Sequence, residues 1–125
     1  GRLMPGGRLR RRESELVILR VAGARGSDYE LTQHRTLGRR AGLSATEIER
    51  AIAGELDDFG ERERILLTAT GELLEQRDLG DATWTRMRAE FGERLCIEIL
   101  LLIGHYDMLA TVLHTLRVQP DSVAR

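Results

Sequence analysis

Apolar residues recur at spacings of three and four over most of the chain, which is the period of an amphipathic α-helix. No segment of the sequence alternates apolar and polar residues in the way that indicates a β-strand. The pattern therefore predicts an all-α fold. About six helices are expected, arranged as antiparallel hairpins because their connections are short, over approximately residues 11–24, 27–41, 44–53, 61–77, 81–91 and 93–117.

Residues at the predicted helix ends support these boundaries. Glycines are expected to end helices at Gly26, Gly42, Gly54 and Gly92. In a capping box, a hydroxyl and a carboxylate three residues apart bind each other's backbone amides. Two helices begin with this pattern: Ser27 with Glu30, and Ser44 with Glu47. Aspartates are the expected N-caps of two later helices: Asp57 or Asp58 before Glu61, and Asp81.

Two of the helices are apolar on most sides and are therefore predicted to be buried. In the first, Glu15 lies on the same side as Leu19 and Ala22. It is either a partly buried carboxylate that needs a partner or a solvated residue near the positive end of the helix dipole. In the last helix, residues 95–103 are apolar except at Glu98. We expect other helices or a second subunit to enclose it, with Glu98 either a buried carboxylate bonded to an arginine or part of a site.

The second helix sets a carboxylate and an imidazole four residues apart on one face, at Glu30 and His34. They form a candidate acid/base pair. Two other interpretations stay open: Glu30 as half of a capping box, and His34 as an ordinary core residue on the buried stripe. On the last helix, His105 and Tyr106 add a second imidazole and a phenol, and Gly104 permits close approach of another backbone.

Charge restricts the classes of function. The 19 basic residues, all arginine, and the 20 acidic residues give a net charge of −1. No overall field therefore favours nucleic acid or an anionic membrane. A DNA-binding helix-turn-helix around Gly42 is disfavoured, because Arg39 and Arg40 are the only basic pair near that turn and Glu47 and Glu49 make its flank acidic.

Cys96 is the only cysteine in the sequence. It offers neither an internal disulfide nor a dithiol redox pair, and we expect it to be buried in a protein of a reducing, cytoplasmic compartment. Residues 95–103 are too few to span a bilayer. The apolar stretch after Arg12 is interrupted by Glu13, Glu15 and Arg20, unlike a secretory signal. We therefore expect no membrane association.

The composition, with 42% hydrophobic residues, fits a single domain that would benefit from self-association. Residues 1–10, which contain Pro5-Gly6-Gly7, are predicted to form a flexible arm. Residues 11–118 are predicted to form the helical domain, and residues 119–125 a fraying tail.

Cofactor motifs are absent from the sequence. It contains no glycine-rich phosphate loop, no Cys/His metal cluster and no Gly-x-Ser-x-Gly elbow. Without a lysine, imine chemistry is also excluded. Hydride and phosphoryl transfer are therefore unsupported, and we expect an enzyme that uses neither metal nor organic cofactor.

Four stretches resemble the carboxymuconolactone decarboxylase family, which also contains the alkylhydroperoxidase D-like (AhpD-like) proteins. They are Arg12-x-x-Glu15-Leu16-x-Ile18-Leu19-x-Val21-Ala22, Tyr29-Glu30-x-x-x-His34, Gly42-Leu43-Ser44-x-x-Glu47-Ile48 and Gly104-His105-Tyr106-x-Met108-Leu109-Ala110. In the peroxidase branch of the family, the site consists of a Glu, a Cys-x-x-Cys pair and a His. Here Glu15 and His34 match, whereas Ser27 and Glu30 occupy the two cysteine positions. Peroxide reduction in the family requires both thiols, so the sequence looks like the cofactor-free decarboxylase branch.

The resemblance implies an AhpD-like helical fold and a symmetric homo-oligomer, commonly a trimer or a hexamer. It also implies a lyase that decarboxylates a carboxylated lactone or related keto acid. His34 would be the general acid/base, helped by Glu30 and Glu15, and the substrate would contact residues from several helices: Ser27, Tyr29, Glu98, His105 and Tyr106. Two alternatives stay open. One is another cofactor-free proton transfer, such as isomerisation, cyclisation or dehydration, and the other is a non-catalytic oligomer that binds a small molecule or a partner protein.

Overall fold

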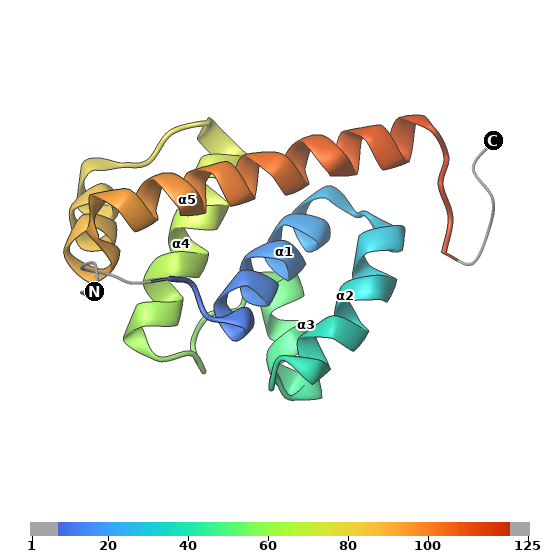
Figure 1. The fold of residues 1–125 in the computed structure, drawn as a ribbon, viewed down its shortest axis with the longest axis horizontal. Coiled ribbons are helices and arrows are strands. Elements are labelled where there is room, and N and C mark those ends of the chain that lie inside the picture. Colours follow the sequence, from blue (N-terminus) through green and yellow to red (C-terminus); the bar gives the residue numbers. More distant parts are fainter. Residues whose placement is uncertain (1–7, 121–125) are drawn as a thin grey trace.

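The computed structural model describes residues 8–120, which form five α-helices: α1 (Arg11–Arg25), α2 (Asp28–Arg40), α3 (Ala45–Ala53), α4 (Glu61–Gln76) and α5 (Asp81–Thr115). No strand occurs between residues 8 and 120, and the all-α prediction is confirmed. α1 lies at the centre of the fold and α5 runs along one side of it (Figure 1). Most of the predicted arm and tail, residues 1–7 and 121–125, lie outside the described residues.

The predicted number of helices is one too high, because the fifth and sixth are joined. Gly92, expected to separate them, lies inside α5 with non-helical backbone angles of φ 78° and ψ 157°. Glycine adopts a positive φ without a steric penalty, so the chain bends sharply at this residue and the helical hydrogen bonding resumes directly after it. The predicted break is therefore a kink.

The fold is built around α1, which packs against the other four helices. Its apolar residues are buried, as predicted: Leu16, Val17, Ile18, Leu19, Val21 and Ala22. One part of the core lies between α1, α4 and α5 and includes Val17, Met87 and Phe91. The other lies between α1, α3 and α4 and includes Leu16, Ile48 and Leu67. α1 and α3 approach closely at Gly23, where an added Cβ would lie only 2.1 Å from the carbonyl oxygen of Ile52.

The predicted helix caps are correct in part. Gly26 ends α1 with φ 64°, and Ser44 and Glu47 form the expected capping box. Ser27 is the N-cap residue of α2, but its side chain makes no capping hydrogen bond, so the predicted box with Glu30 is absent. The N-caps of α4 and α5 are glycines, Gly60 and Gly80, and not the predicted aspartates. Asp58 instead pairs with Arg50, and Asp81 is the first helical residue of α5.

α5 is buried on one face only. Leu95, Cys96, Ile99 and Ile103 are buried in the core, which confirms the prediction for Cys96. Glu98 is exposed, so the expectation that it is a buried carboxylate is wrong. Along residues 95–103, successive residues point to different sides of the helix, and the single chain covers only one of those sides. By length and composition α5 is apolar enough to cross a membrane, and the absence of membrane association stays a prediction.

Candidate active site: a buried Glu-His-Glu centre

Three side chains from α1 and α2 form a buried cluster that we call the His34 centre: Glu15, Glu30 and His34. They are 5%, 4% and 6% exposed, respectively. The turn at Gly26 reverses the chain, so that α2 packs against α1 and His34 faces Glu15. Helical spacing then brings Glu30 to the same side of α2 as His34. The hairpin thus brings together the three residues that were predicted to be catalytic.

The two carboxylates contact opposite nitrogens of the imidazole. His34 Nδ1 lies 2.7 Å from Glu15 Oε1 in a well-formed hydrogen bond. His34 Nε2 lies 3.0 Å from Glu30 Oε2, but this oxygen has no partner in hydrogen-bonding geometry within the described chain. The short distance and the missing hydrogen bond are compatible because hydrogen bonding also depends on angle. Glu15 therefore orients the ring, while the Nε2 side keeps an unsatisfied acceptor.

The pKa of His34 is set by two opposing effects. Burial lowers it, but the hydrogen bond with Glu15 and the close negative charges of Glu15 and Glu30 outweigh burial and raise the pKa from 6.5 to about 9. The imidazole therefore carries a proton on both nitrogens at neutral pH. A buried proton held between two carboxylates is suited to proton transfer.

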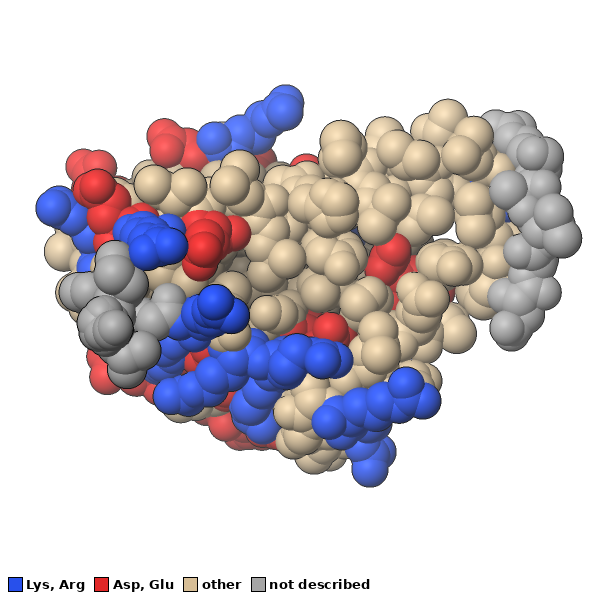
Figure 2. Space-filling model, in the orientation of Figure 1, with Lys and Arg blue, Asp and Glu red and all other residues tan. Residues whose placement is uncertain are grey.

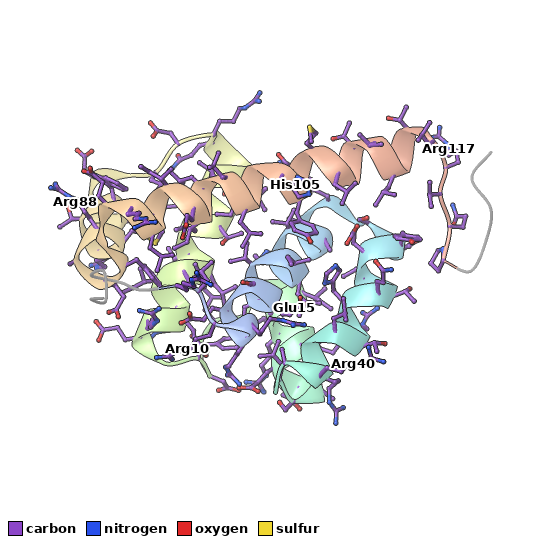
Figure 3. The ribbon with its side chains drawn as sticks, viewed as in Figure 1. Arg10, Glu15, Arg40, Arg88, His105 and Arg117 are labelled. Atoms are coloured by element: carbon purple, nitrogen blue, oxygen red, sulfur yellow. The ribbon has the colours of Figure 1, made fainter. Side chains whose placement is uncertain are left out.

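Aromatic residues of α5 border the His34 centre. The Tyr106 ring meets the His34 ring edge to face at a centroid distance of 5.7 Å, and meets the His105 ring in the same manner at 5.1 Å. Burial, with a smaller effect from the charges of Glu30 and Glu15, raises the pKa of Tyr106 above its usual value of 10. Its phenol therefore stays protonated and is a hydrogen-bond donor beside the imidazole. Figure 3 shows Glu15 on α1 and His105 on α5.

The other predicted substrate contacts are not all brought to this centre. Ser27 and Tyr29 line a separate cavity of about 240 Å³, together with residues of α5 that include Leu113. His105 and Glu98 are exposed on α5, and Glu98 makes none of the contacts of the His34 centre. Of the five residues, only Tyr106 lies directly against His34.

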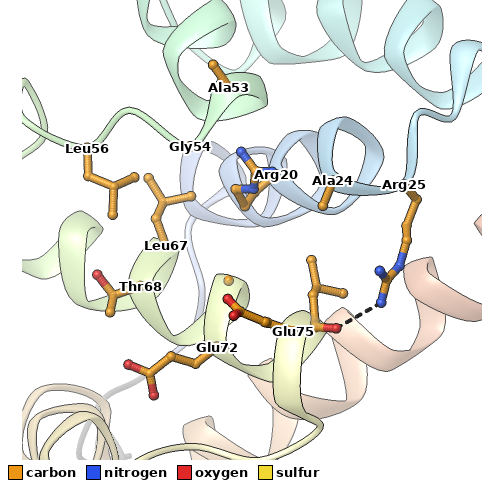
Figure 4. A pocket seen from close by; sticks show the side chains of 12 residues that line it. Arg20, Ala24, Arg25, Ala53, Gly54, Leu56, Leu67, Thr68, Glu72 and Glu75 are labelled. Carbon is orange, nitrogen blue, oxygen red and sulfur yellow. Dashed lines mark hydrogen bonds between the residues drawn. The ribbon is translucent and has the colours of Figure 1, made fainter.

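A larger cavity of about 560 Å³ lies between α1, α3 and α4, away from the His34 centre, and includes Arg20 among its lining residues (Figure 4). Arg20 donates from Nη1 to the carbonyl oxygens of Ala51 and Ile52 at the end of α3, which caps that helix. The cavity contains neither His34 nor its two carboxylates. Because proton transfer requires a titratable cluster, the His34 centre is the better candidate for chemistry despite the size of this cavity.

No group of three or more His, Cys, Asp or Glu side chains between residues 8 and 120 is arranged to hold a metal ion. In the His34 centre these groups bind one another instead. The sequence did not predict that Arg20 caps α3 and lines this larger cavity. The only signal was a positive charge within a largely apolar stretch.

The fold and the centre define an all-α, AhpD-like protein with a buried acid/base cluster at its first helix hairpin. The sequence pattern of the carboxymuconolactone decarboxylase family matches residues 1–71, and the chain belongs to this family. This segment contains the whole His34 centre, whereas Tyr106 lies beyond it.

Among solved structures, the fold is similar to that of a protein of unknown function from Agrobacterium tumefaciens, for which a role as the antioxidant defence protein AhpD has been suggested. The TM-score is 0.78 and the sequence identity 24%, over 90% of this chain and 79% of that one. A search of curated proteins gave no match. The structural likeness establishes the fold, and the chemistry has to be argued from the His34 centre.

Proposed function

We propose that the protein is a cofactor-free carboxy-lyase that decarboxylates a carboxylated lactone or a related keto acid by general acid/base catalysis at His34. The observation that carries the proposal is the buried contact of His34 with Glu15 and Glu30. It supplies a held proton in a site from which water is largely excluded. Membership of the carboxymuconolactone decarboxylase family supports the choice of reaction.

In the proposed reaction, the bond between the substrate carbon and its carboxylate breaks and carbon dioxide leaves. The electron pair of that bond passes to a conjugated carbonyl, which becomes an enolate. His34 then donates its proton from Nε2 to the carbon, and a proton from solvent restores the imidazolium. Glu15 keeps the ring in place through Nδ1, so that Nε2, which lies on the side of Glu30, is the nitrogen that donates in the proposed reaction.

Two neighbouring groups complete the proposed site. The phenol of Tyr106, which stays protonated, donates a hydrogen bond to the enolate oxygen. Ser27, the other donor suggested by sequence, is less suitable because it lines a different cavity. Glu30 offers an acceptor without a hydrogen-bond partner within the described chain, and it shares the proton of His34 as the substrate enters.

Thiol peroxidase activity is not proposed, although the similar Agrobacterium protein has been linked to antioxidant defence. The two cysteine positions of that chemistry hold Ser27 and Glu30. Cys96 is buried, and burial raises the pKa of its thiol, which disfavours the reactive thiolate.

The test follows the loss of a lactone chromophore and the release of carbon dioxide. His34→Ala is expected to lower the rate by about 100-fold or more, the usual contribution of a positioned acid or base. His114→Ala is the matched control, because His114 is exposed on α5, and it is expected to keep the wild-type rate. Equal rates for the wild type and His34→Ala would remove His34 from the mechanism.

The same assay separates the alternative functions. Turnover without carbon dioxide release would indicate isomerisation, cyclisation or dehydration at the same centre. If lactones and keto acids raise the melting temperature but are not turned over, the protein is a ligand-binding module and the lyase proposal is wrong.

A further inference from the structure

α5 carries an exposed apolar row, which we call the α5 stripe: Ile97, Leu101, Met108 and Val112. Their exposed fractions are 52%, 69%, 60% and 43%. Contiguous exposed apolar surface on a soluble protein usually marks an interaction site. Between Ile99 and Leu116 the only Asp, Glu or Arg is Asp107, and that residue pairs with Arg25. In Figure 2, the upper edge of the C-terminal half of α5 is correspondingly free of charged side chains.

The spacing of the α5 stripe is the same in both directions along the helix. From residue 97 the steps are four, seven and four residues, and the midpoint falls between Gly104 and His105. If a second copy of α5 is laid antiparallel with a two-fold axis at this midpoint, Ile97 lies opposite Val112 of the second copy. Leu101 then lies opposite Met108. An interface of this kind is self-complementary, as two-fold symmetry requires.

We propose that α5 packs antiparallel against α5 of a second copy of this chain, about a two-fold axis at residues 104 and 105. The stripe runs for about 22 Å along the helix at 1.5 Å per residue, which is long enough for ridges-into-grooves packing of two helices. The surface above Gly104 is open, since an added Cβ there would meet nothing within 4 Å. The backbones can therefore come close at the axis, and an uncharged face meets an uncharged face.

This interface explains the exposure of His105, which sequence reasoning placed in the substrate site. His105 lies at the proposed axis and contacts Tyr106, whose ring also contacts His34. The second copy therefore covers the helix turn that positions Tyr106, and the two His34 centres lie on either side of the axis. The proposal depends on α5 alone and not on the proposed chemistry. It requires an even-numbered assembly, a dimer or a hexamer, and excludes an isolated trimer.

The first experiment measures the molar mass of the full chain by size-exclusion chromatography with light scattering. The wild type, with a chain mass of 14.1 kDa, is expected to have an even multiple of that mass. The double variant Leu101→Glu/Met108→Glu is expected to weaken the two-fold contact by at least about 100-fold, and to elute as a monomer or, from a hexamer, as a trimer. Leu116→Glu is the control, because Leu116 is 47% exposed but follows the last residue of α5, Thr115, and has no apolar counterpart across the proposed axis. The molar mass of this variant in solution should equal that of the wild type.

The second experiment tests the antiparallel register without relying on a destabilising variant. Leu101→Cys/Met108→Cys should form a disulfide between two chains under mild oxidation, because the two positions face each other across the axis. Leu101→Cys alone should not, and neither should the wild type, whose Cys96 is buried.

Three results would overturn the proposal. The first is a wild type that is monomeric or trimeric. The second is cross-linking of Leu101→Cys alone as readily as of the double variant, which would indicate parallel packing. The third is a monomer that floats with phosphatidylcholine/phosphatidylglycerol vesicles, which would assign the α5 stripe to a membrane.

Discussion

Glu13 and Glu15 are two buried carboxylates on the same helix, and they have different partners. Glu13 is 1% exposed and binds Arg62, with Arg62 Nε donating to its Oε2 at 2.5 Å, and also accepts from the backbone N–H of Arg10. Glu15 is 5% exposed and binds the imidazole of His34. Arginine stays charged at every relevant pH, whereas histidine can release its proton. The two residues have the same type and similar burial, so the partner decides which carboxylate belongs to the framework and which to the proposed proton-transfer site.

The two clusters shift pKa values in opposite directions. Burial raises the pKa of Glu13, but its hydrogen bonds with Arg62 and the backbone of Arg10 outweigh burial, so the pKa is lowered overall. In the other cluster the pKa of His34 is raised to about 9. The Glu13–Arg62 pair is therefore charged throughout the neutral range, whereas the His34 centre loses its proton as the pH rises through about 9.

The largest expected effect comes from breaking the Glu13–Arg62 pair. Arg62→Met leaves Glu13 as a buried charge without its main partner, and removes the cation–π contact with Phe91, whose ring centroid is 4.4 Å from Arg62 Cζ. We expect a loss of about 3 kcal/mol in the free energy of unfolding, measured by urea denaturation. The double variant Glu13→Leu/Arg62→Met should recover most of this loss, because no lone charge remains. A single variant as stable as the wild type would show that the pair is dispensable.

The Glu13–Arg62 pair and the His34 centre should affect stability in different pH ranges. The pKa of His34 is raised on folding, so its contribution is fully present below the unfolded value of about 6.5 and is lost as the pH rises through about 9. Glu13 has a lowered pKa, so its contribution is present above the usual value of about 4.5 and is lost in acid. Urea unfolding between pH 6 and pH 10 should therefore show a decline of about 2 kcal/mol, since one unit of pKa corresponds to about 1.4 kcal/mol and coupled groups share the effect.

His34→Gln is the control for the pH series. Because it removes the titrating group and leaves the Glu13–Arg62 pair intact, it should flatten the decline above pH 6. If the free energy of unfolding declines by the same amount in this variant, the decline comes from titrating groups other than His34.

The two carboxylates of the His34 centre can be compared in the same way. Glu15→Gln removes the negative charge from the hydrogen bond to Nδ1 and should cost about 2 kcal/mol at pH 7. Glu30→Gln should cost less, because Glu30 Oε2 makes no hydrogen bond within the described chain. Thermal unfolding of the two variants measures this order, and the reverse order would show that Glu30 is the main partner of His34.

The smallest effect concerns the two serines at helix starts. Ser44 accepts a hydrogen bond from the backbone N–H of Glu47 at 3.0 Å, so Ser44→Ala should cost about 1 kcal/mol. Ser27 makes no such bond, and Ser27→Ala should stay within about 0.5 kcal/mol of the wild type. If both substitutions cost the same, the Ser27 side chain would have a capping role that the structure does not show.

Predictions from the sequence were correct where a local rule, such as a helix-ending glycine, met no competing contact from elsewhere in the fold. Gly26 and Gly42 end their helices because a positive φ there favours glycine. The apolar residues of α1 surround the helix axis, which predicts a helix buried on most sides, and they are buried. The same α1–α2 hairpin brought Glu15, Glu30 and His34 together, because each was placed on an apolar helix face.

Predictions failed where a tertiary partner competed with the local rule. Glu30 was equally suited to capping α2, and its contact with His34 prevailed. Asp58 was a suitable N-cap, but it pairs with Arg50. Glu98 lies in an apolar run, and which side of α5 is covered depends on the other helices. Spacing within one helix could predict neither the pairing of Asp58 with Arg50 nor the exposure of Glu98.

The most direct test of the central claim is the pKa of His34, measured by NMR from the pH dependence of its imidazole signals, with His34→Gln used for assignment. We predict a value near 9 in the wild type and a value closer to 6.5 in Glu15→Gln. A wild-type pKa at or below 6.5 would mean that burial outweighs both carboxylates. His34 would then be a neutral core residue and not the proton donor proposed here.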